Sequence, residues 1–213
     1  MGKRRRKKSR ANEEEEEDDD SDNAEDTSFV FHPVVTQDMS TIFFCGEINR
    51  VNVVTFARML HSCSQRLNRR AWESGFDRSD GFITVNLTTS GGEAECGLSA
   101  ADHIMACAVP VRVIIDGEVS SAGTLLAMGA TESLRMRRHA TMLVHQLSSS
   151  AAGKLTDLQD YTDNCHRVDA LMKKLYLERC PSLDHTKLEE LMKREHVMDA
   201  EEALRYGFID SIY

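Results

Sequence analysis

The chain has 213 residues, of which 41% are hydrophobic and 29% are charged, and its formal net charge at pH 7 is −9. This length accommodates one compact domain with a self-supporting core and an additional tail. No apolar stretch is long enough for a signal peptide or a membrane span, so we expect a soluble, cytoplasmic protein with no membrane partner.

The N-terminal residues form two blocks of opposite charge. Residues 3–8 are all basic, and residues 13–20 are all acidic. Because like charges repel and bury no apolar surface, we expect residues 1–28 to be a disordered tail and residues 29–213 to form the folded domain. The basic block is typical of a nuclear-import signal, a nucleic-acid contact or a contact with an anionic surface, and a purely solubilising tail is an equal alternative. The neighbouring acidic residues neutralise it at short range, so we do not expect a nucleic-acid partner.

Hydrophobic patterns predict alternating strands and helices along the rest of the chain. Strands are predicted at residues 42–45, 82–87, 111–115, 134–136 and 141–144. Helices are predicted at residues 51–66, 94–107, 122–129 and 154–178. This alternation predicts an α/β fold with right-handed crossovers.

Two of the segments have additional features. The charged stretch 66–80, between the first helix and the next strand, is predicted to be a surface insertion. The helix at 154–178 carries an apolar stripe, because hydrophobic residues recur at spacings of three and four from Leu155 to Tyr176. Such a stripe either covers the protein's own sheet or contacts a neighbouring subunit.

The cysteines show no Cys-x-x-Cys spacing and lie mostly in apolar patterns. They are Cys45, Cys63, Cys96, Cys107, Cys165 and Cys180. We therefore expect reduced thiols in the core and no zinc site. No other metal site is evident, and we expect no cofactor.

The segment Gly117–Gly123 places Ser120 and Ser121 between a β-branched strand and an apolar helix. A serine at such a junction lies at a helix N-terminus, where unpaired backbone N–H groups can stabilise a developing oxyanion. This position suits a nucleophile in acyl transfer. The alternative is an ordinary loop in which one serine caps the helix. The segment lacks the Gly-x-Ser-x-Gly elbow, because Val119 stands at the place of the first glycine.

Two further groups follow predicted strands. Gly91 and Gly92 come after the strand at 82–87, and glycine lets the backbone approach a ligand closely. His145 follows the strand at 141–144. A turn and a solvated or structural histidine are the ordinary alternatives. The order Gly-Gly, Ser, His at successive strand ends favours a common site.

From about Ile42 to the C-terminus, the chain resembles the ClpP family, the serine peptidase subunits of the Clp proteases. The resemblance rests on a first core strand, a Gly-Gly loop, a nucleophile segment, a histidine segment and a C-terminal signature, at residues 42–48, 87–92, 117–123, 143–146 and 200–210. It implies a ClpP/crotonase-like fold of repeated ββα units with a protruding helical handle.

The resemblance also implies roles for individual residues. Ser121 would be the nucleophile, because Gly123 follows it by two residues as in the family. His145 would be the general base. The backbone N–H groups of Gly92 and Ala122 would bind the oxyanion.

The third catalytic position departs from the family pattern. Aligning back from the C-terminal signature places Glu195 where the family has aspartate. Glutamate can orient and stabilise an imidazolium, but its extra methylene changes its reach. A solvated residue in a charged run is the alternative for Glu195, and Asp157 and Asp199 are conceivable substitutes. Residues 88–90 also replace the family's Asn-Ser-Pro with Thr-Thr-Ser, which removes a proline before the glycines.

By resemblance, the chain would be a serine endopeptidase that cleaves unfolded polypeptides inside a homo-oligomeric chamber. In ClpP, the handle helix joins two stacked heptameric rings, and an AAA+ unfoldase ATPase delivers the substrates. Alternatives are a catalytically inactive ring subunit, a virus-type protein-processing protease, and a crotonase-like acyl-CoA enzyme. The last would need neither Ser121 nor His145.

Overall fold

The computed structural model describes residues 34–74 and 81–213, all of which belong to the unit Phe31–Tyr213. The strands within these ranges are β1 Val34–Asp38, β2 Thr41–Cys45, β3 Ile83–Thr89, β4 Val111–Ser120, β5 Ser133–Met136, β6 Thr141–Leu143, β7 Val197–Met198 and β8 Ser211–Ile212. The helices are α1 Arg50–Ser74, α2 Ala94–Met105, α3 Ala122–Met128, α4 Leu155–Arg179, α5 His185–Met192 and α6 Ala200–Tyr206. The tail predicted at residues 1–28 lies outside the described residues, so its disorder stays a prediction.

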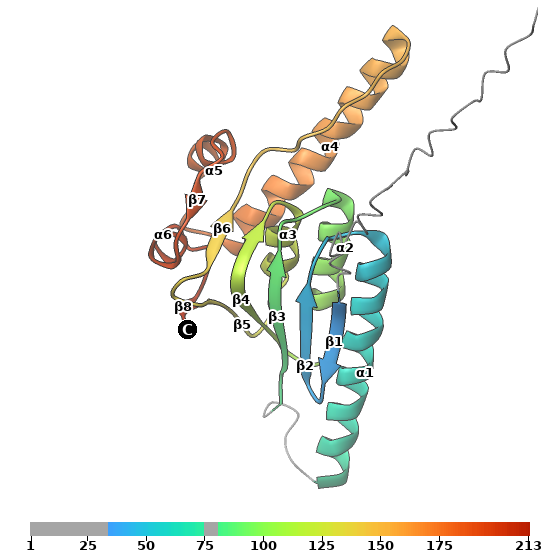
Figure 1. Ribbon diagram of the computed structural model, residues 1–213, viewed down its shortest axis with the longest axis vertical. Coiled ribbons are helices and arrows are strands. Elements are labelled where there is room, and N and C mark those ends of the chain that lie inside the picture. Colours follow the sequence, from blue (N-terminus) through green and yellow to red (C-terminus); the bar gives the residue numbers. More distant parts are fainter. Residues whose placement is uncertain (1–33, 75–80) are drawn as a thin grey trace, which may run out of the picture. The chain divides into compact units, whose positions relative to one another are not determined.

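The strands form one sheet in the order β1-β2-β3-β4-β5-β8 (Figure 1). Strands β2, β3, β4, β5 and β8 run parallel, whereas β1 pairs antiparallel with β2. Helix α1 packs against α2, and α2 against α3. This is the predicted α/β architecture, in which helices connect parallel strands and cover the sheet.

Strand β4 changes partner halfway along its length. Its first part, Arg112–Ile115, pairs with β5, and its last part, Glu118–Ser120, pairs with β6. Strand β6 in turn pairs antiparallel with β7. The C-terminal end of β4 therefore lies between β3 and β6, which brings together three segments that are distant in the sequence.

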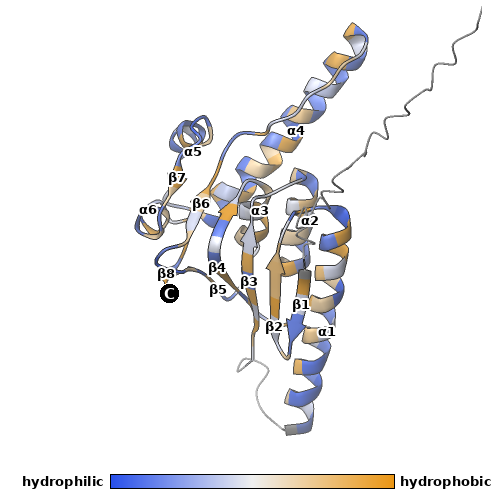
Figure 2. Cartoon of the chain, viewed as in Figure 1, coloured by the Kyte–Doolittle hydropathy of each residue, from blue (hydrophilic) through white to orange (hydrophobic). Residues whose placement is uncertain are grey.

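The core lies between the sheet and the helices. Every second side chain of β3 is buried, beginning with Ile83, Val85 and Leu87. All residues of α3 are buried, and all of them except Thr124 are apolar or glycine. Figure 2 shows the apolar residues concentrated on the central strands and on α3. This burial fixes the register of the strands that lead to the site.

Helix α1 is longer than predicted. The prediction of a helix end near residue 66 and a surface insertion from there is wrong as far as Ser74, because the helix continues to that residue. The sequence from Arg66 to Ser74 contains neither glycine nor proline, and the first glycine comes at position 75. Residues 75–80 lie outside the described residues.

Helix α4 has two different halves. Met172, Leu175 and Tyr176 in its C-terminal half are buried, whereas Leu155 at its start is 73% exposed. Its N-terminal half extends away from the sheet, and the segment that follows β6 runs alongside it (Figure 1). Only the second half of the predicted apolar stripe therefore covers the protein's own core.

The six cysteines are free, and only Cys63 and Cys180 are buried. The other four are partly exposed, so the prediction of core thiols is confirmed for only two of them. Within residues 34–74 and 81–213, no helix combines the length and the apolar character needed to cross a bilayer.

A bidentate ion pair joins β4 to the residue before β5. The Arg112 guanidinium donates to both carboxylate oxygens of Glu132, at 2.8 and 2.9 Å, and holds the pKa of Glu132 at about 2, below its usual 4.5. A carboxyl group whose pKa is lower in the folded than in the unfolded state stabilises the fold at pH values above its unfolded-state pKa. This stabilisation is lost as the pH falls through the folded-state pKa.

We therefore expect Glu132→Gln to lower the free energy of unfolding at pH 7 by about 1–2 kcal/mol, because a partly buried bidentate pair is lost. The difference from the wild type should shrink as the pH falls from 4.5 towards about 2. Urea unfolding across this range measures both quantities. Glu178→Gln, which removes an exposed pair with Lys174, is the control and should change little. If the difference in the free energy of unfolding between the wild type and Glu132→Gln stayed constant with pH, the depressed pKa of Glu132 would be contradicted.

Candidate active site

Ser121 lies at the junction between β4 and α3 and has a strained backbone. Its φ is 54° and its ψ is −128°, a conformation that non-glycine residues rarely adopt. It occupies the N-cap position of α3, but its side chain makes no capping hydrogen bond. The simple capping role, which was the alternative for this serine, is therefore not what the structure shows. The side chain is left available to other groups.

Ser120 has a different environment. It is only 5% exposed, and its hydroxyl donates to the Glu118 carboxylate at 2.8 Å. Ser121 is partly exposed, and its hydroxyl has no hydrogen-bond partner within the described residues. Of the two neighbouring serines, Ser121 is thus the one whose hydroxyl can meet a substrate.

Two backbone hydrogen bonds hold Ser121 in place. Its N–H donates to the carbonyl of Leu143, at the end of β6, at 2.9 Å. Its carbonyl accepts from the N–H of Thr124 at 3.0 Å. Both strand pairing and the first turn of α3 therefore stabilise the strained conformation.

Gly91 packs directly against the serine. Its φ is +105°, and a β-carbon added to it would lie 2.6 Å from Ser121 Cβ and 2.8 Å from the Ser120 carbonyl oxygen. Both the conformation and the contact require glycine.

The N–H group of Gly92 donates no backbone hydrogen bond within the described residues. A single parallel bridge joins Gly92 to Ile48, in which the N–H of Ile48 donates to Gly91 and the N–H of Glu93 donates to Ile48. This pattern turns the N–H of Gly92 away from Ile48. Ala122, the first residue of α3, has an N–H that the helix itself does not satisfy. Both residues line the cavity that contains Ser121.

The cavity has a volume of about 410 Å³, and residues that follow three of the predicted strands line it. It is lined by Gly92, Glu93, Ala94, Glu95, Ser121, Ala122, His145, Gln146, Leu147, Ser148, Ser149, Tyr161, Asn164, Cys165, Val168 and Met172. The structure thus brings together four of the five predicted site residues, namely Gly92, Ser121, Ala122 and His145.

His145 follows β6 and is partly exposed at the cavity. Its ring has no hydrogen-bond partner within the described residues, so neither ring nitrogen is committed elsewhere. The next residue is fixed to a different element, because the Gln146 N–H donates to the Met192 carbonyl at the end of α5 at 2.8 Å.

Glu195 lies in the turn between α5 and β7 and does not line the cavity. It is exposed, and within the described part of the chain its carboxylate makes no hydrogen bond or ion pair. The antiparallel pairing of β6 with β7 joins Met142 to Met198 and Leu143 to Val197 and ends there. The next backbone hydrogen bond between these segments joins Gln146 to Met192, so the strand register does not itself set Glu195 opposite His145.

The two substitute carboxylates have other roles. Asp199 caps α6, because its side chain accepts from the N–H of Glu202 at 2.8 Å. The Asp157 carboxylate accepts from the backbone N–H of Lys154 at 3.4 Å, at the start of α4. Both carboxylates are engaged at helix N-termini.

The sequence analysis missed the walls of the cavity. Glu93 and Glu95 contribute two carboxylates directly after the Gly-Gly loop, and α4 contributes Tyr161 and Cys165. Tyr161 and Ser149 share a hydrogen bond, which ties α4 to the segment after the histidine. The only sequence signal for the α4 residues was their position in the apolar stripe.

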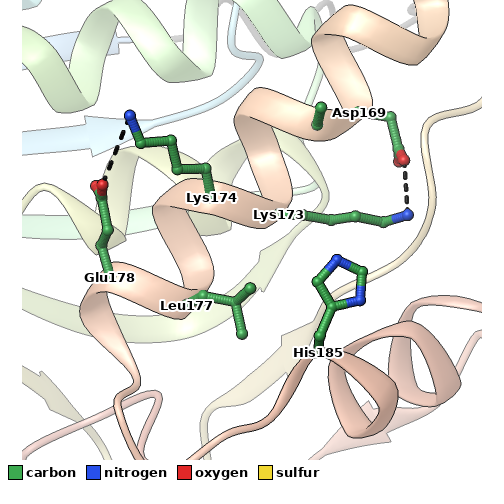
Figure 3. A pocket seen from close by; sticks show the side chains of 7 residues that line it. Asp169, Lys173, Lys174, Leu177, Glu178 and His185 are labelled. Atoms are coloured by element: carbon green, nitrogen blue, oxygen red, sulfur yellow. Dashed lines mark ion pairs between the residues drawn. The ribbon is translucent and has the colours of Figure 1, made fainter.

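A second cavity, of about 530 Å³, lies against α4 and the start of α5 (Figure 3). Its charged side chains compensate one another, because Lys173 pairs with Asp169 at 2.8 Å and Lys174 with Glu178 at 3.8 Å. Its lining contains no serine, threonine or cysteine. This cavity therefore offers no hydroxyl or thiol nucleophile and is not the candidate active site.

Comparison with protein-family models gives a match to the Clp protease family over residues 76–213, more than half of the chain. The matched region contains the cavity and all five predicted site residues. The resemblance and the fold expected from the motifs are confirmed by this match and by the mixed α/β sheet. Such a match supports a ClpP-type peptidase and an oligomeric assembly in general terms. The chain belongs to the Clp protease family.

Proposed function

We propose that the protein is a serine endopeptidase of the ClpP type that cleaves unfolded polypeptides by a Ser-His-acid mechanism. The observation that carries this proposal is the strained, uncapped Ser121 in one cavity with His145 and with the N–H groups of Gly92 and Ala122. Strain at a non-glycine residue persists where the surrounding structure holds it, and such residues cluster at active sites.

In the proposed reaction, the Ser121 hydroxyl attacks the substrate carbonyl while His145 accepts its proton. The N–H groups of Gly92 and Ala122 donate to the resulting oxyanion. His145 then returns the proton to the leaving amine, which departs and leaves an acyl-enzyme. Water, deprotonated by the same histidine, hydrolyses this ester and restores the serine.

This function is tested with a fluorescein-labelled unfolded protein, such as casein, as substrate. We expect release of small fluorescent peptides by the wild-type protein, with the same rate in the presence of a metal chelator. Pretreatment with a fluorophosphonate should abolish the release. A protein that is folded and oligomeric but releases no peptides would contradict the proposal.

Glu195 is proposed to orient His145 and to stabilise its protonated form. The pairing of β6 with β7 supports this role, because His145 follows β6 by two residues and Glu195 precedes β7 by two residues. We expect Glu195→Gln to lower kcat for peptide hydrolysis by about 10²- to 10⁴-fold, since a neutral amide no longer stabilises the imidazolium. Glu195→Asp should retain most of the activity, because it restores the family's usual residue.

Glu201→Gln is the matched control for this prediction. Glu201 is an exposed glutamate in the first turn of α6 and does not line the cavity. Steady-state hydrolysis by the three variants separates the outcomes. If Glu195→Gln and Glu201→Gln were equally active, Glu195 would have no part in the reaction.

The carboxylates of Glu93 and Glu95 lead us to expect a preference for basic substrates. Both line the cavity with Ser121, whereas its lining contains neither lysine nor arginine. We expect peptides with arginine near the scissile bond to have a kcat/KM about three- to tenfold above that of matched citrulline peptides, because exposed ion pairs contribute modestly. The double variant Glu93→Gln/Glu95→Gln should remove the preference. A ratio unchanged in this variant would contradict the prediction.

The assembly is proposed to be a chamber of stacked homo-oligomeric rings, heptameric as in ClpP. We propose that it lies in the cytoplasm and has an AAA+ unfoldase as a partner. The uncovered N-terminal half of α4 supports a contact with another subunit, because Leu155 at its start is 73% exposed. Leu171, in the C-terminal half, is also 54% exposed. Native mass spectrometry gives the number of subunits directly. A strictly monomeric protein would contradict the chamber.

A catalytically inactive ring subunit is the second candidate. It is favoured by one observation, the exposed carboxylate of Glu195, which makes no polar contact within the described residues. In that case the fold and the assembly would be retained, but neither casein nor a fluorophosphonate would react with the protein. A virus-type processing protease would use the same chemistry as the first candidate on a different substrate.

A further inference from the structure

A buried pair of hydroxyl groups connects the serine junction to α4. Thr124, in the first turn of α3, and Tyr176, in the C-terminal half of α4, are both 0% exposed. Their hydroxyl oxygens are 2.6 Å apart, although the residues are 52 positions apart in the sequence. The Thr124 hydroxyl is also 2.6 Å from the carbonyl oxygen of Ser121.

The direction of these hydrogen bonds follows from the number of protons. A carbonyl oxygen only accepts, so Thr124 must use its single hydroxyl proton for Ser121. Tyr176 must therefore donate its own proton to the Thr124 oxygen. Burial raises the pKa of Tyr176, which keeps this donor protonated. The result is a directed chain from Tyr176 through Thr124 to Ser121.

This chain of hydroxyl groups acts on the residue whose backbone is strained. The direction of a residue's carbonyl depends on its ψ, and the ψ of Ser121 is −128°. The Ser121 carbonyl accepts from both the N–H and the hydroxyl of Thr124, at 3.0 and 2.6 Å. The N–H of Ser121 is held separately by Leu143 of β6. Strand pairing thus restrains one side of the serine, and the hydroxyl chain restrains the other.

Tyr176 is itself held firmly. Its ring packs edge-to-face on Phe208, with centroids 6.1 Å apart and an interplanar angle of 85°. A core that needed only packing would fill these positions with phenylalanine and valine, because buried hydroxyls lose their hydration. The two hydroxyl groups hydrogen-bond to each other, and the Thr124 hydroxyl donates to the Ser121 carbonyl. This arrangement points to a role at Ser121.

We propose that Thr124 and Tyr176 are positioning residues, which hold the Ser121 backbone in its strained conformation and so aim its hydroxyl into the cavity. The inference rests on the proposed function of Ser121 and extends it to two residues that do not touch the substrate. Because Tyr176 belongs to α4, the proposed hydrogen-bond chain also makes the orientation of Ser121 depend on the position of α4.

The test compares Tyr176→Phe, Thr124→Val and Thr124→Ser with the wild type. Tyr176→Phe keeps the ring but removes the first donor, and we expect kcat for peptide hydrolysis to fall about three- to tenfold with KM unchanged. Thr124→Val removes both bonds, and kcat should fall about 10- to 100-fold. Thr124→Ser keeps the hydroxyl and should restore kcat.

Thr131→Val is the matched control. Its hydroxyl accepts from the Val111 N–H at 2.9 Å, at the far end of β4 from the serine, so it should affect stability but not kcat. Normal kcat in Tyr176→Phe and Thr124→Val, at temperatures where both are folded, would overturn the inference. So would a loss in Thr124→Ser as large as that in Thr124→Val.

Hydrogen exchange provides a readout that does not need catalysis. Peptides covering residues 119–126 should exchange faster in Tyr176→Phe and Thr124→Val than in the wild type and in Thr131→Val. Unchanged exchange would overturn the inference whether or not the protein is an enzyme. If the wild type hydrolyses nothing while the exchange differs as expected, the proposed function fails but the restraint on Ser121 stands.

Discussion

Replacing Ser121 with alanine is expected to lower kcat for peptide hydrolysis by about 10⁴-fold or more, the scale on which loss of a nucleophile acts in serine peptidases. The reason is that Ser121 alone of the two neighbouring serines has a free hydroxyl in the cavity with His145. The melting temperature should not fall, because alanine removes only a partly exposed oxygen. Steady-state kinetics with a fluorogenic peptide and a thermal melt measure the two effects.

Ser120→Ala is the control for this experiment. It removes the buried hydroxyl that donates to Glu118, so we expect a modest loss of stability and activity within a few-fold of the wild type. If Ser120→Ala were inactive and Ser121→Ala active, the nucleophile would be the other serine and the proposed geometry would be wrong.

Gly91→Ala is expected to have the second-largest effect. Its methyl group would meet Ser121 Cβ at 2.6 Å and the Ser120 carbonyl at 2.8 Å, and its φ of +105° is unfavourable for alanine. Because backbone atoms must shift, we expect kcat/KM to fall about 10²-fold or more, since small misplacements of reacting groups are costly. The free energy of unfolding should fall by about 1–3 kcal/mol. Kinetics and urea unfolding measure these changes.

Gly81→Ala is the matched control. A β-carbon at Gly81 would make only an ordinary contact, 3.8 Å from Leu67 Cδ2. Its kcat/KM should equal that of the wild type, and its stability should be unchanged or slightly higher. Wild-type activity in Gly91→Ala would show that the loop does not pack against the serine as described.

The central strands could be predicted because their residues are buried on one or both faces. Strand β3 begins one residue after its predicted start and β4 begins at its predicted start, where both sequences are β-branched and apolar. Strand β4 continues to Ser120, five residues beyond its predicted end, because its polar and glycine residues at 116–118 hide the continuation. Strands β7 and β8 have two residues each, too few for any periodicity, and they form only because β6 and β5 offer partners. The end of α1 was missed because charged residues favour a surface loop and a surface helix equally.

Parts of the candidate site could also be predicted, because it is built at strand ends. Gly92, Ser121 and His145 each follow a strand, and the parallel sheet brings such ends to one edge. The lateral walls depend on tertiary packing. Nothing near Thr124 in the sequence indicates that Tyr176 lies beside it, and the approach of β7 to β6 appears only in the strand pairing.

The central claim is that Ser121 is an activated nucleophile, and intact mass spectrometry after fluorophosphonate treatment tests it most directly. We predict a single adduct on the wild-type protein, formed when the Ser121 oxygen displaces fluoride from phosphorus. The adduct should persist in Ser120→Ala and disappear in Ser121→Ala. A folded, oligomeric wild-type protein that gains no mass, or an adduct that persists in Ser121→Ala, would contradict the claim.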